Sequence, residues 1–412
     1  MAPQTILSIN AGSSSVKVSV YTYEERGKVP YQEAEIQVSG LTAPPASLKY
    51  NRGEHAEKKE VPGVTSQEDA FEIILKHLIG DEGLPMIASH NDVGYCCHRV
   101  VHGGDFDDAH ALDQVTFRRV DELSDLAPLH NAGALALVRA VQKQVPQARN
   151  IAFFDTAFHS TIPTYISTYP IDPKVAKLHK LRKYGFHGIS YAFISKSTAK
   201  FLKKPLQELN IIALHLGSGA SACAIQGGKS MDTTMGLTPL AGLPGATRSG
   251  SIDPSVVFHY TNDAGTLSPE STKDMHVTQA EIILNKQSGW KALAGTTDFG
   301  VISEGKSEGA QLAFDILVDR ILGYVGSYYV RLGGRVDALV FAGGIGEKGA
   351  RLRKELVEKV RCLGFELDPG KNEQELEDEV VDISASGAKN KVLVCQTDEQ
   401  VRENSGEQRR RC

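Results

Sequence analysis

Two segments of the 412-residue chain share one strand–turn–strand pattern, and this repetition constrains the fold more than any other feature of the sequence. Ile6-Leu-Ser-Ile-Asn-Ala-Gly-Ser-Ser and Ile211-Ile-Ala-Leu-His-Leu-Gly-Ser-Gly each predict a strand, a polar residue, a Gly-Ser turn and a second strand. Corresponding residues, such as Asn10 and His215, lie 205 positions apart. Because that offset is half of the chain, we expect two related domains, and chance similarity of two short segments is the alternative.

The composition excludes several classes of protein. The chain has 45 Lys and Arg against 50 Asp and Glu, which rules out a globally basic protein that binds nucleic acid or a membrane surface. Its six cysteines form no Cys-x-x-Cys spacing, as is typical of a reduced intracellular protein. No apolar run approaches 18 residues, and a strand-like segment over 5–10 argues against a cleavable leader. We expect a cytoplasmic protein that contacts neither nucleic acid nor a membrane.

Strand and helix patterns alternate in both halves and predict α/β layers. Strands are expected over 4–9, 16–22, 31–39, 46–51, 93–101, 150–154, 336–342 and 391–395. Helices are expected over 66–79, 131–145, 307–332 and 348–362, with a glycine turn over 343–346. The first of these helices is predicted to begin at a capping box formed by Thr65 and Glu68.

The glycine content, 39 residues of 412, is above the usual fraction of roughly 7% and predicts turns that approach a ligand closely. Asn10-Ala-Gly-Ser-Ser-Ser-Val-Lys17 is the strongest such turn. Its small residues let backbone N–H groups converge on an anion, its hydroxyls add donors, and Lys17 adds a positive charge. An ordinary hairpin turn is the simpler alternative, but a lysine in an apolar strand favours an anionic ligand.

Two further glycine patterns depend on their context. Residues 300–307 fit the Walker A pattern, but the stretch before Gly300 is a poor strand, so we predict a surface loop that leads into a helix. Residues 344–349 fit G-x-G-x-x-G after a strand, with Glu366 and Asp368 near the usual place of a ribose-binding acid. We expect a phosphate- or adenosine-side turn at a helix N-terminus there, and a nicotinamide oxidoreductase is the alternative.

Arginines and histidines gather beside glycines or at strand ends in five segments, 98–104, 128–131, 155–159, 184–188 and 247–254. A single histidine of this kind is more often structural than catalytic, but five segments favour a common anionic ligand. Many cations, few acids and two phosphate-type loops suit phosphoryl transfer, in which positioning and charge neutralisation do most of the catalysis. Histidine-only metal binding is less favoured, because no His-Glu-x-x-His spacing is present.

With these motifs the sequence resembles the acetate kinase family of the actin/hexokinase-like ATPase superfamily, in particular its eukaryotic, fungal branch. The matching segments are 9–17, 98–104, 127–131, 154–159, 184–190, 232–240, 247–254 and 342–347. The resemblance implies an α/β fold of two duplicated, ribonuclease H-like domains with a cleft between them. It implies an N-terminal domain over 1–158, completed by 401–412, a nucleotide-binding C-terminal domain over 159–400, and a homodimer.

The resemblance also implies roles for single residues. Arg99 would hold the substrate carboxylate, Asp155 would place Mg²⁺ and the reacting groups, and His187 and Arg248 would stabilise the transferring phosphoryl group. The residues that would line the substrate are Arg99, Val101, Leu129, His130, Phe186 and Pro239. The residues that would bind the nucleotide are Ser13, Ser15, Lys17, His215, Leu216, Gly217, Ser218, Gly219, Asp298, Phe299, Gly300, Gly344, Ile345, Gly346, Glu347 and Lys348. Asn10 and Glu399 would bind Mg²⁺, with Mn²⁺ as a substitute.

The implied reaction is reversible, Mg²⁺-dependent, in-line transfer of a phosphoryl group from ATP to acetate, which gives acetyl phosphate and ADP. A carboxylate is ionised at pH 7 and needs no general base, which suits a site rich in arginine. A propionate kinase, a kinase that uses pyrophosphate as donor and a non-catalytic ATP-binding switch are the alternatives. Ser218, Gly300 and Lys348 depart from the family's usual Asn, Arg and Asn, and the tail after Glu399 lacks its usual apolar helix.

Overall fold

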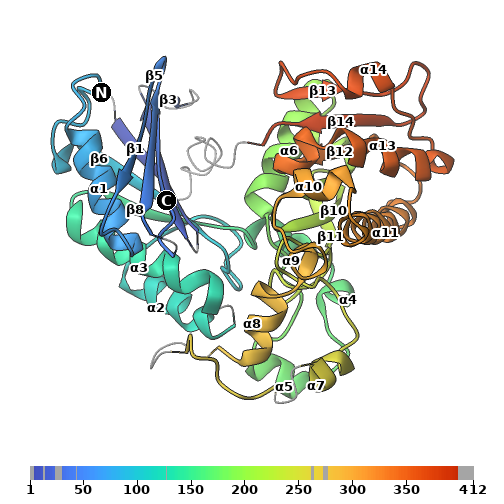
Figure 1. Cartoon of the computed structure of the whole chain (residues 1–412), viewed down its shortest axis with the longest axis horizontal. Coiled ribbons are helices and arrows are strands. Elements are labelled where there is room, and N and C mark those ends of the chain that lie inside the picture. The colour runs from blue at the N-terminus through green and yellow to red at the C-terminus, as the bar shows by residue number, and fades with distance from the viewer. Residues whose placement is uncertain are drawn as a thin grey trace. The chain divides into compact units, whose positions relative to one another are not determined.

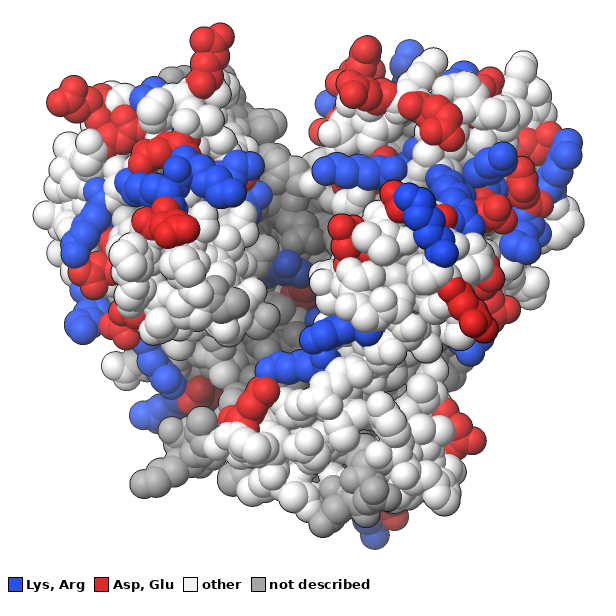
Figure 2. Space-filling model, in the orientation of Figure 1, with Lys and Arg blue, Asp and Glu red and all other residues white. Residues whose placement is uncertain are grey.

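The computed structural model describes residues 4–12, 14–23, 30–42, 44–126, 128–260, 264–271 and 277–397. The described chain forms two compact units, 4–157 (unit 1) and 158–397 (unit 2), each built on its own β-sheet (Figure 1). On the face drawn in Figure 2, basic and acidic side chains are interspersed over both units, in keeping with the net charge of −5.

Unit 1 contains an eight-stranded sheet in the order β5-β4-β3-β2-β1-β6-β8-β7. Its strands are β1 (Gln4–Ala11), β2 (Ser15–Tyr23), β3 (Tyr31–Ser39), β4 (Ala46–Arg52), β5 (His55–Val61), β6 (Val93–Val100), β7 (His110–Ala111) and β8 (Arg149–Phe154). Its α-helices are α1 (Gln67–Ile79), α2 (Gln114–Glu122) and α3 (Pro128–Gln144). Helices α1 and α3 pack on each other and on the central strands, and they enclose the main apolar core of the unit.

Unit 2 contains a six-stranded sheet in the order β11-β10-β9-β12-β14-β13. Its strands are β9 (Asn210–Leu216), β10 (Ala220–Gln226), β11 (Lys229–Thr233), β12 (Ala338–Ala342), β13 (Val380–Asp382) and β14 (Lys391–Cys395). Its α-helices are α4 (Thr164–Ser167), α5 (Pro173–Leu178), α6 (Gly188–Phe201), α7 (Ser255–Tyr260), α8 (Gln279–Lys286), α9 (Gly289–Ala294), α10 (Phe299–Glu304), α11 (Glu308–Arg331), α12 (Gly343–Lys348), α13 (Ala350–Lys359) and α14 (Pro369–Asn372).

Both faces of the unit 2 sheet are buried, because helices cover each of them. Side chains alternate along each strand, so neighbouring residues pack on opposite faces. Ile211 and Ala213 pack with α6 on one face, whereas Ile212 and Leu214 pack with α11 on the other. A strand that is covered on both faces reads as a continuous apolar run, as β9 does.

The two sheets share one topology. In unit 1, β1 pairs antiparallel with β2 and parallel with β6, which pairs parallel with β8. In unit 2, β9 pairs antiparallel with β10 and parallel with β12, which pairs parallel with β14. The repetition predicted from the 205-residue offset is therefore present in the fold, and the predicted α/β class is confirmed.

Three local predictions differ from the structure. Helix α1 is capped by Ser66, whose hydroxyl accepts from the Asp69 N–H over 3.1 Å, and not by Thr65, because the helix begins one residue later than predicted. The expected glycine turn over 343–346 is instead the start of α12, since the chain passes directly from β12 into a helical turn at Gly343. Strand β5 was not expected, because its alternation of charged residues has no apolar face.

Candidate active site

In each unit, residues predicted for the site lie where parallel strands end. In unit 1, Asn10 lies near the end of β1, Arg99 near the end of the parallel strand β6, and Asp155 directly after β8. In unit 2, His215 near the end of β9 pairs with Ala342 at the end of β12. The carboxyl edge of such strands is the usual place of ligands in α/β sheets. Each unit therefore carries its candidate residues at the ligand-binding edge of its own sheet.

Arg99 and Asp155 form a bidentate ion pair in unit 1. Arg99 Nε donates to Asp155 Oδ1 over 3.0 Å, and Nη2 donates to Oδ2 over 2.8 Å. The Asp155 side chain is only 1% exposed, so the pair is fixed in place as well as charge-assisted. A substrate carboxylate on Arg99 would share the guanidinium with Asp155, and the sequence patterns did not predict this coupling.

The turn after β6 is held by side chains to which the sequence analysis gave no role. The Asn131 carboxamide accepts from the His102 N–H and donates to the His102 carbonyl, both over 2.9 Å. The Thr156 hydroxyl accepts from the Gly103 N–H over 3.1 Å. All three bonds are buried, so they fix the backbone beside Val101, a predicted substrate residue. The sequence could have indicated Asn131, because this residue ends the segment Ala-Pro-Leu-His-Asn (127–131) that carries part of the family resemblance.

The first hairpin, β1 and β2, places Lys17 directly opposite Asn10. The Gly12 N–H closes the turn by donating to the Ser15 carbonyl over 2.8 Å. The Lys17 ammonium lies 2.7 Å from a carboxylate oxygen of Glu35 on β3, and both side chains are about one-third exposed. The positive charge predicted for this turn is therefore shared with a carboxylate of the same sheet.

Arg248 packs against the turn of the second hairpin, β9 and β10. A Cβ atom added to Gly219 would lie 2.7 Å from Arg248 Nη1, so the guanidinium packs directly on this glycine. The Gly217 N–H donates to the Gly219 carbonyl over 3.2 Å, and the Ala246 N–H donates to the Ser218 carbonyl over 2.8 Å. The hairpin turn and the arginine loop thus form one structure, in which a side chain at position 219 would displace the arginine.

Hydrogen bonds to backbone carbonyls hold the Arg248 loop in position. The Gly245 N–H donates to the Arg248 carbonyl over 3.0 Å, which closes a tight turn. The Thr247 hydroxyl donates to the Asn285 carbonyl over 2.7 Å, and the Ser288 N–H donates to the Thr247 carbonyl over 3.0 Å. An arginine whose loop is fixed in this way is preorganised for electrostatic stabilisation.

The rings of His187 and His215 lie against each other at a tilt beside the second hairpin. Their ring centroids lie 4.3 Å apart with an interplanar angle of 37°. His187 Nδ1 lies 2.8 Å from Ser221 Oγ, and His215 Nδ1 lies 2.8 Å from Ser190 Oγ. His187 has φ 61°, in the left-handed region that residues other than glycine seldom occupy. Such backbone strain is typical of functional sites, and here it directs a side chain at the N-cap of α6.

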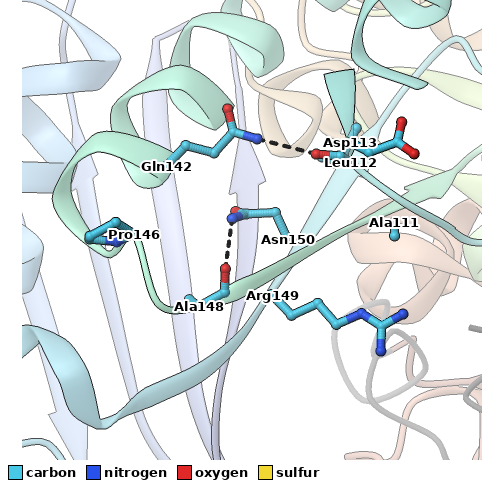
Figure 3. Close-up of a pocket in the computed structure, with 8 residues that line it drawn as sticks. All are labelled: Ala111, Leu112, Asp113, Gln142, Pro146, Ala148, Arg149 and Asn150. Atoms are coloured by element: carbon cyan, nitrogen blue, oxygen red, sulfur yellow. Dashed lines mark hydrogen bonds between the residues drawn. The ribbon is translucent and has the colours of Figure 1, made fainter. Parts of the chain in front are cut away.

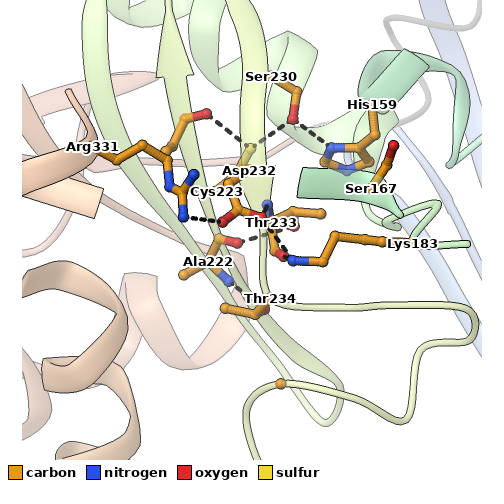
Figure 4. Close-up of polar contacts among 12 residues, drawn as sticks. His159, Ser167, Lys183, Ala222, Cys223, Ser230, Asp232, Thr233, Thr234 and Arg331 are labelled. Atoms are coloured by element: carbon orange, nitrogen blue, oxygen red, sulfur yellow. Dashed lines mark hydrogen bonds and ion pairs between the residues drawn. The ribbon is translucent and has the colours of Figure 1, made fainter. Parts of the chain in front are cut away.

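A buried histidine anchors Phe186, the residue before His187. His159 Nε2 donates to the Phe186 carbonyl over 2.9 Å. Its Nδ1 accepts from the Ser230 hydroxyl over 2.8 Å (Figure 4). Burial lowers the pKa of His159 to about 4, so the ring is neutral at pH 7. One donor and one acceptor suit this neutral ring, and His159 is a structural residue.

Asp232 joins the segment before His187 to β11 and α11 (Figure 4). Its carboxylate lies 2.8 Å from Lys183 Nζ and 3.4 Å from Arg331 Nη2. Lys183 also donates to the Thr233 carbonyl over 3.1 Å. The Asp232 side chain is 9% exposed, so two cations depend on one largely buried carboxylate.

Residues 5–402 of the chain match the acetokinase family. The chain belongs to this family. A protein of Emericella nidulans named "Probable acetate kinase" is 56% identical over 407 residues, which cover 97% of this chain and 96% of that protein. A propionate kinase from Francisella tularensis has a TM-score of 0.85 and 33% identity, with 98% of both chains covered. Porphyromonas gingivalis acetate kinase has a TM-score of 0.83 and 32% identity, with 97% of this chain and 98% of that chain covered. The fold is that of the actin/hexokinase-like ATPases, as the resemblance implied.

Apart from the residues of the first hairpin, the residues that the resemblance assigns to the nucleotide lie on three elements of unit 2. Besides the second hairpin, these are α10 and α12. Asp298 caps α10, since its Oδ1 accepts from the Gly300 N–H over 2.7 Å, and Phe299 packs edge-on against a buried tryptophan. Helix α12 carries Gly344, Ile345, Gly346, Glu347 and Lys348. Glu347 Oε1 accepts from the Thr397 N–H and hydroxyl, both over 3.1 Å, which ties α12 to the chain after β14.

The Walker A match does not form a phosphate loop. Its lysine, Lys306, is 81% exposed and pairs with Glu304 over 2.9 Å. Its residues 300–304 lie in α10, and irregular chain over 295–298, not a strand, precedes that helix. The prediction that this segment is no phosphate loop is confirmed, but the predicted surface loop is limited to 305–307, because 300–304 are helical.

Some residues assigned by the family resemblance lie outside the description. Ser13 and Glu399 are outside the described residues, as are the side chains of Leu129 and His130. Within the described ranges, no group of three or more His, Cys, Asp or Glu side chains is placed to hold a metal ion. No helix among the described residues is both long and apolar enough to span a membrane.

A hollow of about 320 Å³ in unit 1 lies away from these residues. Leu112, Gln142 and Asn150 line it, and their polar groups are used within the protein, since Gln142 donates to the Leu112 carbonyl and Asn150 to Ala148 (Figure 3). Asn150 Oδ1 also accepts from His98 Nε2 over 2.8 Å. The hollow is at the start of β8, whereas Asp155 follows its end, so the hollow and the candidate site are separate.

Proposed function

We propose that the chain is an acetate kinase, which transfers the γ-phosphoryl group of ATP reversibly to acetate. The observation that carries the proposal is the 56% identity, over nearly the whole of both chains, to the Emericella nidulans protein named "Probable acetate kinase". The geometry supports it through arginines at the carboxyl edges of both sheets, namely Arg99 in unit 1 and Arg248 in unit 2.

The reaction needs no proton transfer. An oxygen of the acetate carboxylate attacks the γ-phosphorus of ATP, and the bond from that phosphorus to the bridging oxygen of ADP breaks. Acetyl phosphate and ADP are the products. Because acetate is ionised at pH 7, its oxygen is already a nucleophile. Catalysis then depends on positioning two anions and on stabilising the charge of the phosphoryl oxygens in the transition state.

The four proposed catalytic residues divide into two pairs. In unit 1, Arg99 would bind the acetate carboxylate, and Asp155 would orient the guanidinium through their bidentate pair. In unit 2, Arg248 and His187 would stabilise the transferring phosphoryl group, because both lie beside the second hairpin, where the terminal phosphates of the nucleotide would bind.

ATP or ADP would bind along the second hairpin, α10 and α12, and Lys17 and Ser15 of the first hairpin would meet its phosphates. Mg²⁺, when bound, would neutralise charge on the phosphates. The Asn10 carboxamide oxygen is a hard donor that fits Mg²⁺, and the Glu399 carboxylate would supply the second protein ligand. Mn²⁺ accepts the same oxygen donors and would substitute.

The acid specificity would come from four apolar side chains, Val101, Leu129, Phe186 and Pro239, with His130 beside them. A pocket for a methyl group distinguishes one extra methylene by only about 1–3 kcal/mol, so propionate should be a poorer substrate and not an excluded one. Propionate phosphorylation is the second candidate activity, because a propionate kinase shares the fold at a TM-score of 0.85. Val101→Ala should narrow the difference between the two acids.

A hydroxylamine trap tests the proposal directly, because it converts an acyl phosphate to a hydroxamate that can be quantified. Acetate, propionate and butyrate are each supplied with ATP or with pyrophosphate, with and without Mg²⁺. We expect most hydroxamate from acetate, ATP and Mg²⁺. Equal kcat/KM for acetate and butyrate, or turnover with pyrophosphate alone, would contradict the proposal, and ATP binding without turnover would favour a switch.

We also propose that the protein forms a homodimer through a surface of unit 2. Large apolar side chains are exposed on α4, α5, α7 and the loops beside them: Tyr165, Ile171, Val175, Leu178, Ile252, Val256, Phe258 and Tyr260. Helices α5 and α7 are both drawn at the lower end of the unit (Figure 1). An exposed apolar patch of this kind marks an interface. In light scattering, Phe258→Glu should give monomers, whereas Val115→Glu on the exposed face of α2 should not.

The proposed location is the cytoplasm, so the protein would work in a reducing environment. Cys96, Cys97, Cys223, Cys362 and Cys395 form no disulfide within the described part of the chain, which suits that compartment.

We propose that 401–412 complete the N-terminal domain, and deletion of these residues should then lower the melting temperature.

A further inference from the structure

We propose that Tyr191 and Ser221 set the tautomer of His187, so that its neutral imidazole carries the proton on Nε2. Neither Tyr191 nor Ser221 was singled out by the sequence motifs. In the proposed reaction they are positioning residues, because they act on the phosphoryl group only through His187. That consequence for catalysis depends on the proposed function, whereas the tautomer itself does not.

The three side chains form one chain of hydrogen bonds within unit 2. His187 is the N-cap of α6, Tyr191 lies one turn into that helix, and Ser221 lies on β10. Ser221 Oγ lies 2.8 Å from His187 Nδ1 and also bonds to the Tyr191 hydroxyl. Tyr191 and Ser221 are both fully buried, whereas His187 is half-buried. This series of hydrogen bonds therefore runs from the interior of the unit to the candidate site.

The direction of the hydrogen bonds follows from the buried phenol. Burial raises the pKa of Tyr191 well above its usual value, so the phenol keeps its proton. A buried O–H that donates to nothing is destabilising, so we assign the phenol as donor to Ser221 Oγ. The Ser221 proton then points to His187 Nδ1, which must accept it. A neutral imidazole that accepts at Nδ1 carries its proton on Nε2.

This tautomer matters because an imidazole with a proton on Nε2 can donate a hydrogen bond to a phosphoryl oxygen while it adds no charge. The opposite tautomer would direct a lone pair at that oxygen and would repel it. His187 has a strained, left-handed backbone, so its ring needs partners that hold it in one orientation. The hydrogen bonds from Tyr191 through Ser221 to His187 (the relay) supply that constraint. His215 has a similar partner, Ser190, which bonds to its Nδ1 from α6.

The test is nuclear magnetic resonance of the full chain labelled with ¹⁵N in histidine. His187→Gln identifies the ring signals of His187 by their loss. In the unmodified protein we expect a protonated Nε2 and an unprotonated Nδ1. Ser221→Ala should convert these signals to a mixture of tautomers, and Tyr191→Phe should do so in part. Ser190→Ala removes an equally buried hydroxyl from the other histidine, so it should leave the His187 signals unchanged.

Activity supplies the second readout. Ser221→Ala should lower kcat about 10- to 100-fold with little change in KM, less than the 10²–10³-fold typical of losing a transition-state donor outright. A protonated Nδ1 in the unmodified protein, or an unchanged tautomer in both variants, would overturn the proposal. Folding of each variant is verified by the fluorescence of Trp290. If the tautomer is as expected but hydroxylamine traps no acyl phosphate, the relay stands and the proposed function fails.

Discussion

The two units share one sheet topology, but they hold the side chains at its carboxyl edge by different means. In unit 1, Arg99 and Lys17 each lie against a carboxylate of the same unit. In unit 2, His187 and His215 each bond to a serine hydroxyl, and Arg248 is positioned by the backbone of its loop and hairpin. Fixed ion pairs suit an anion that is present throughout the reaction. Hydroxyl-bonded imidazoles and a preorganised arginine suit charge that develops in the transition state.

The largest expected effect separates the two arginines. Arg248→Ala should lower kcat by roughly 10³ or more, by analogy with arginine fingers, because its benefit is specific to the transition state. Arg99→Ala should instead raise the KM for acetate more than it lowers kcat, because a carboxylate clamp acts in the ground state as well. Steady-state kinetics with acetate as the varied substrate measures both.

A purely structural role for either arginine would appear as a lower melting temperature, so thermal unfolding accompanies the kinetics. Arg248→Lys is the matched control, and it should recover little activity, since an ammonium cannot reproduce the planar guanidinium. A folded Arg248→Ala variant with near-normal kcat would mean that unit 2 supplies a different cation.

The next effect concerns acid stability, in which the two units should agree. Burial lowers the pKa of His98 in unit 1 and of His159 in unit 2 to about 4. Between about pH 6.5 and pH 4 the unfolded state binds a proton that the folded state does not, so stability falls as the pH falls through this window. Each histidine should contribute roughly 3 kcal/mol to the loss by pH 4.

The chain's one tryptophan, Trp290, lies in unit 2 and is 2% exposed, so its fluorescence reports the unfolding of that unit. We expect His159→Gln to flatten the pH dependence measured by Trp290 in urea, because glutamine does not titrate in this range. His98→Gln should leave the Trp290 signal with its original slope. The same slope in all three proteins would show that other groups cause the acid sensitivity.

A smaller effect is expected from the charge network of unit 2. Asp232→Asn should destabilise the unit by about 1–3 kcal/mol, less than for a fully buried pair, because Lys183 and Arg331 are 20% and 32% exposed. Asp337→Asn is the matched control, since Asp337 pairs with one lysine and is 27% exposed. Urea unfolding followed at Trp290 should give the larger loss for Asp232→Asn, and equal losses would argue against a special role for the network.

The smallest effect is expected at Lys306. Lys306→Ala should leave nucleotide binding and turnover nearly unchanged, because the ammonium lies on an exposed loop between two helices. Lys17→Ala should weaken turnover, since Lys17 lies opposite Asn10 on the first hairpin. Isothermal titration with ATP compares the two. Loss of ATP binding in Lys306→Ala with normal binding in Lys17→Ala would move the phosphate site away from the hairpins.

The fold could be read from the sequence where apolar pattern and turn residues agree. Strand β3 and strand β14 occur at their predicted residues, and α11 differs from its prediction by one residue at each end. The exceptions have local causes. Adjacent Thr65 and Ser66 can both cap a helix, and strand β5 lies at the edge of its sheet with charged residues that give no period-2 apolar signal.

The candidate site could be predicted only as a set of residue types. The family motifs indicate Arg99, Asp155, His187 and Arg248, and the structure places each at a strand end, a helix start or a fixed loop. Their partners come from distant parts of the chain, however. Nothing in the local pattern around Ser221 indicates that its hydroxyl bonds to a histidine 34 positions earlier, because that contact exists only once β10 packs against α6.

The position of β14 in its sheet bears on how the protein is made. All eight strands of the unit 1 sheet are encoded before residue 155, whereas β14, residues 391–395, lies between β12 and β13. From the end of β12 at residue 342 to the start of β14 at residue 391, a ribosome takes roughly 2–10 seconds at about 5–20 residues per second. Throughout that time β12 has an unpaired edge, which is a template for wrong pairing. A ribosome that stalls shortly before residue 391 would therefore hold a chain in which the unit 1 sheet has all its strands. The unit 2 sheet of that chain would still have an open edge at β12 and would be prone to aggregate.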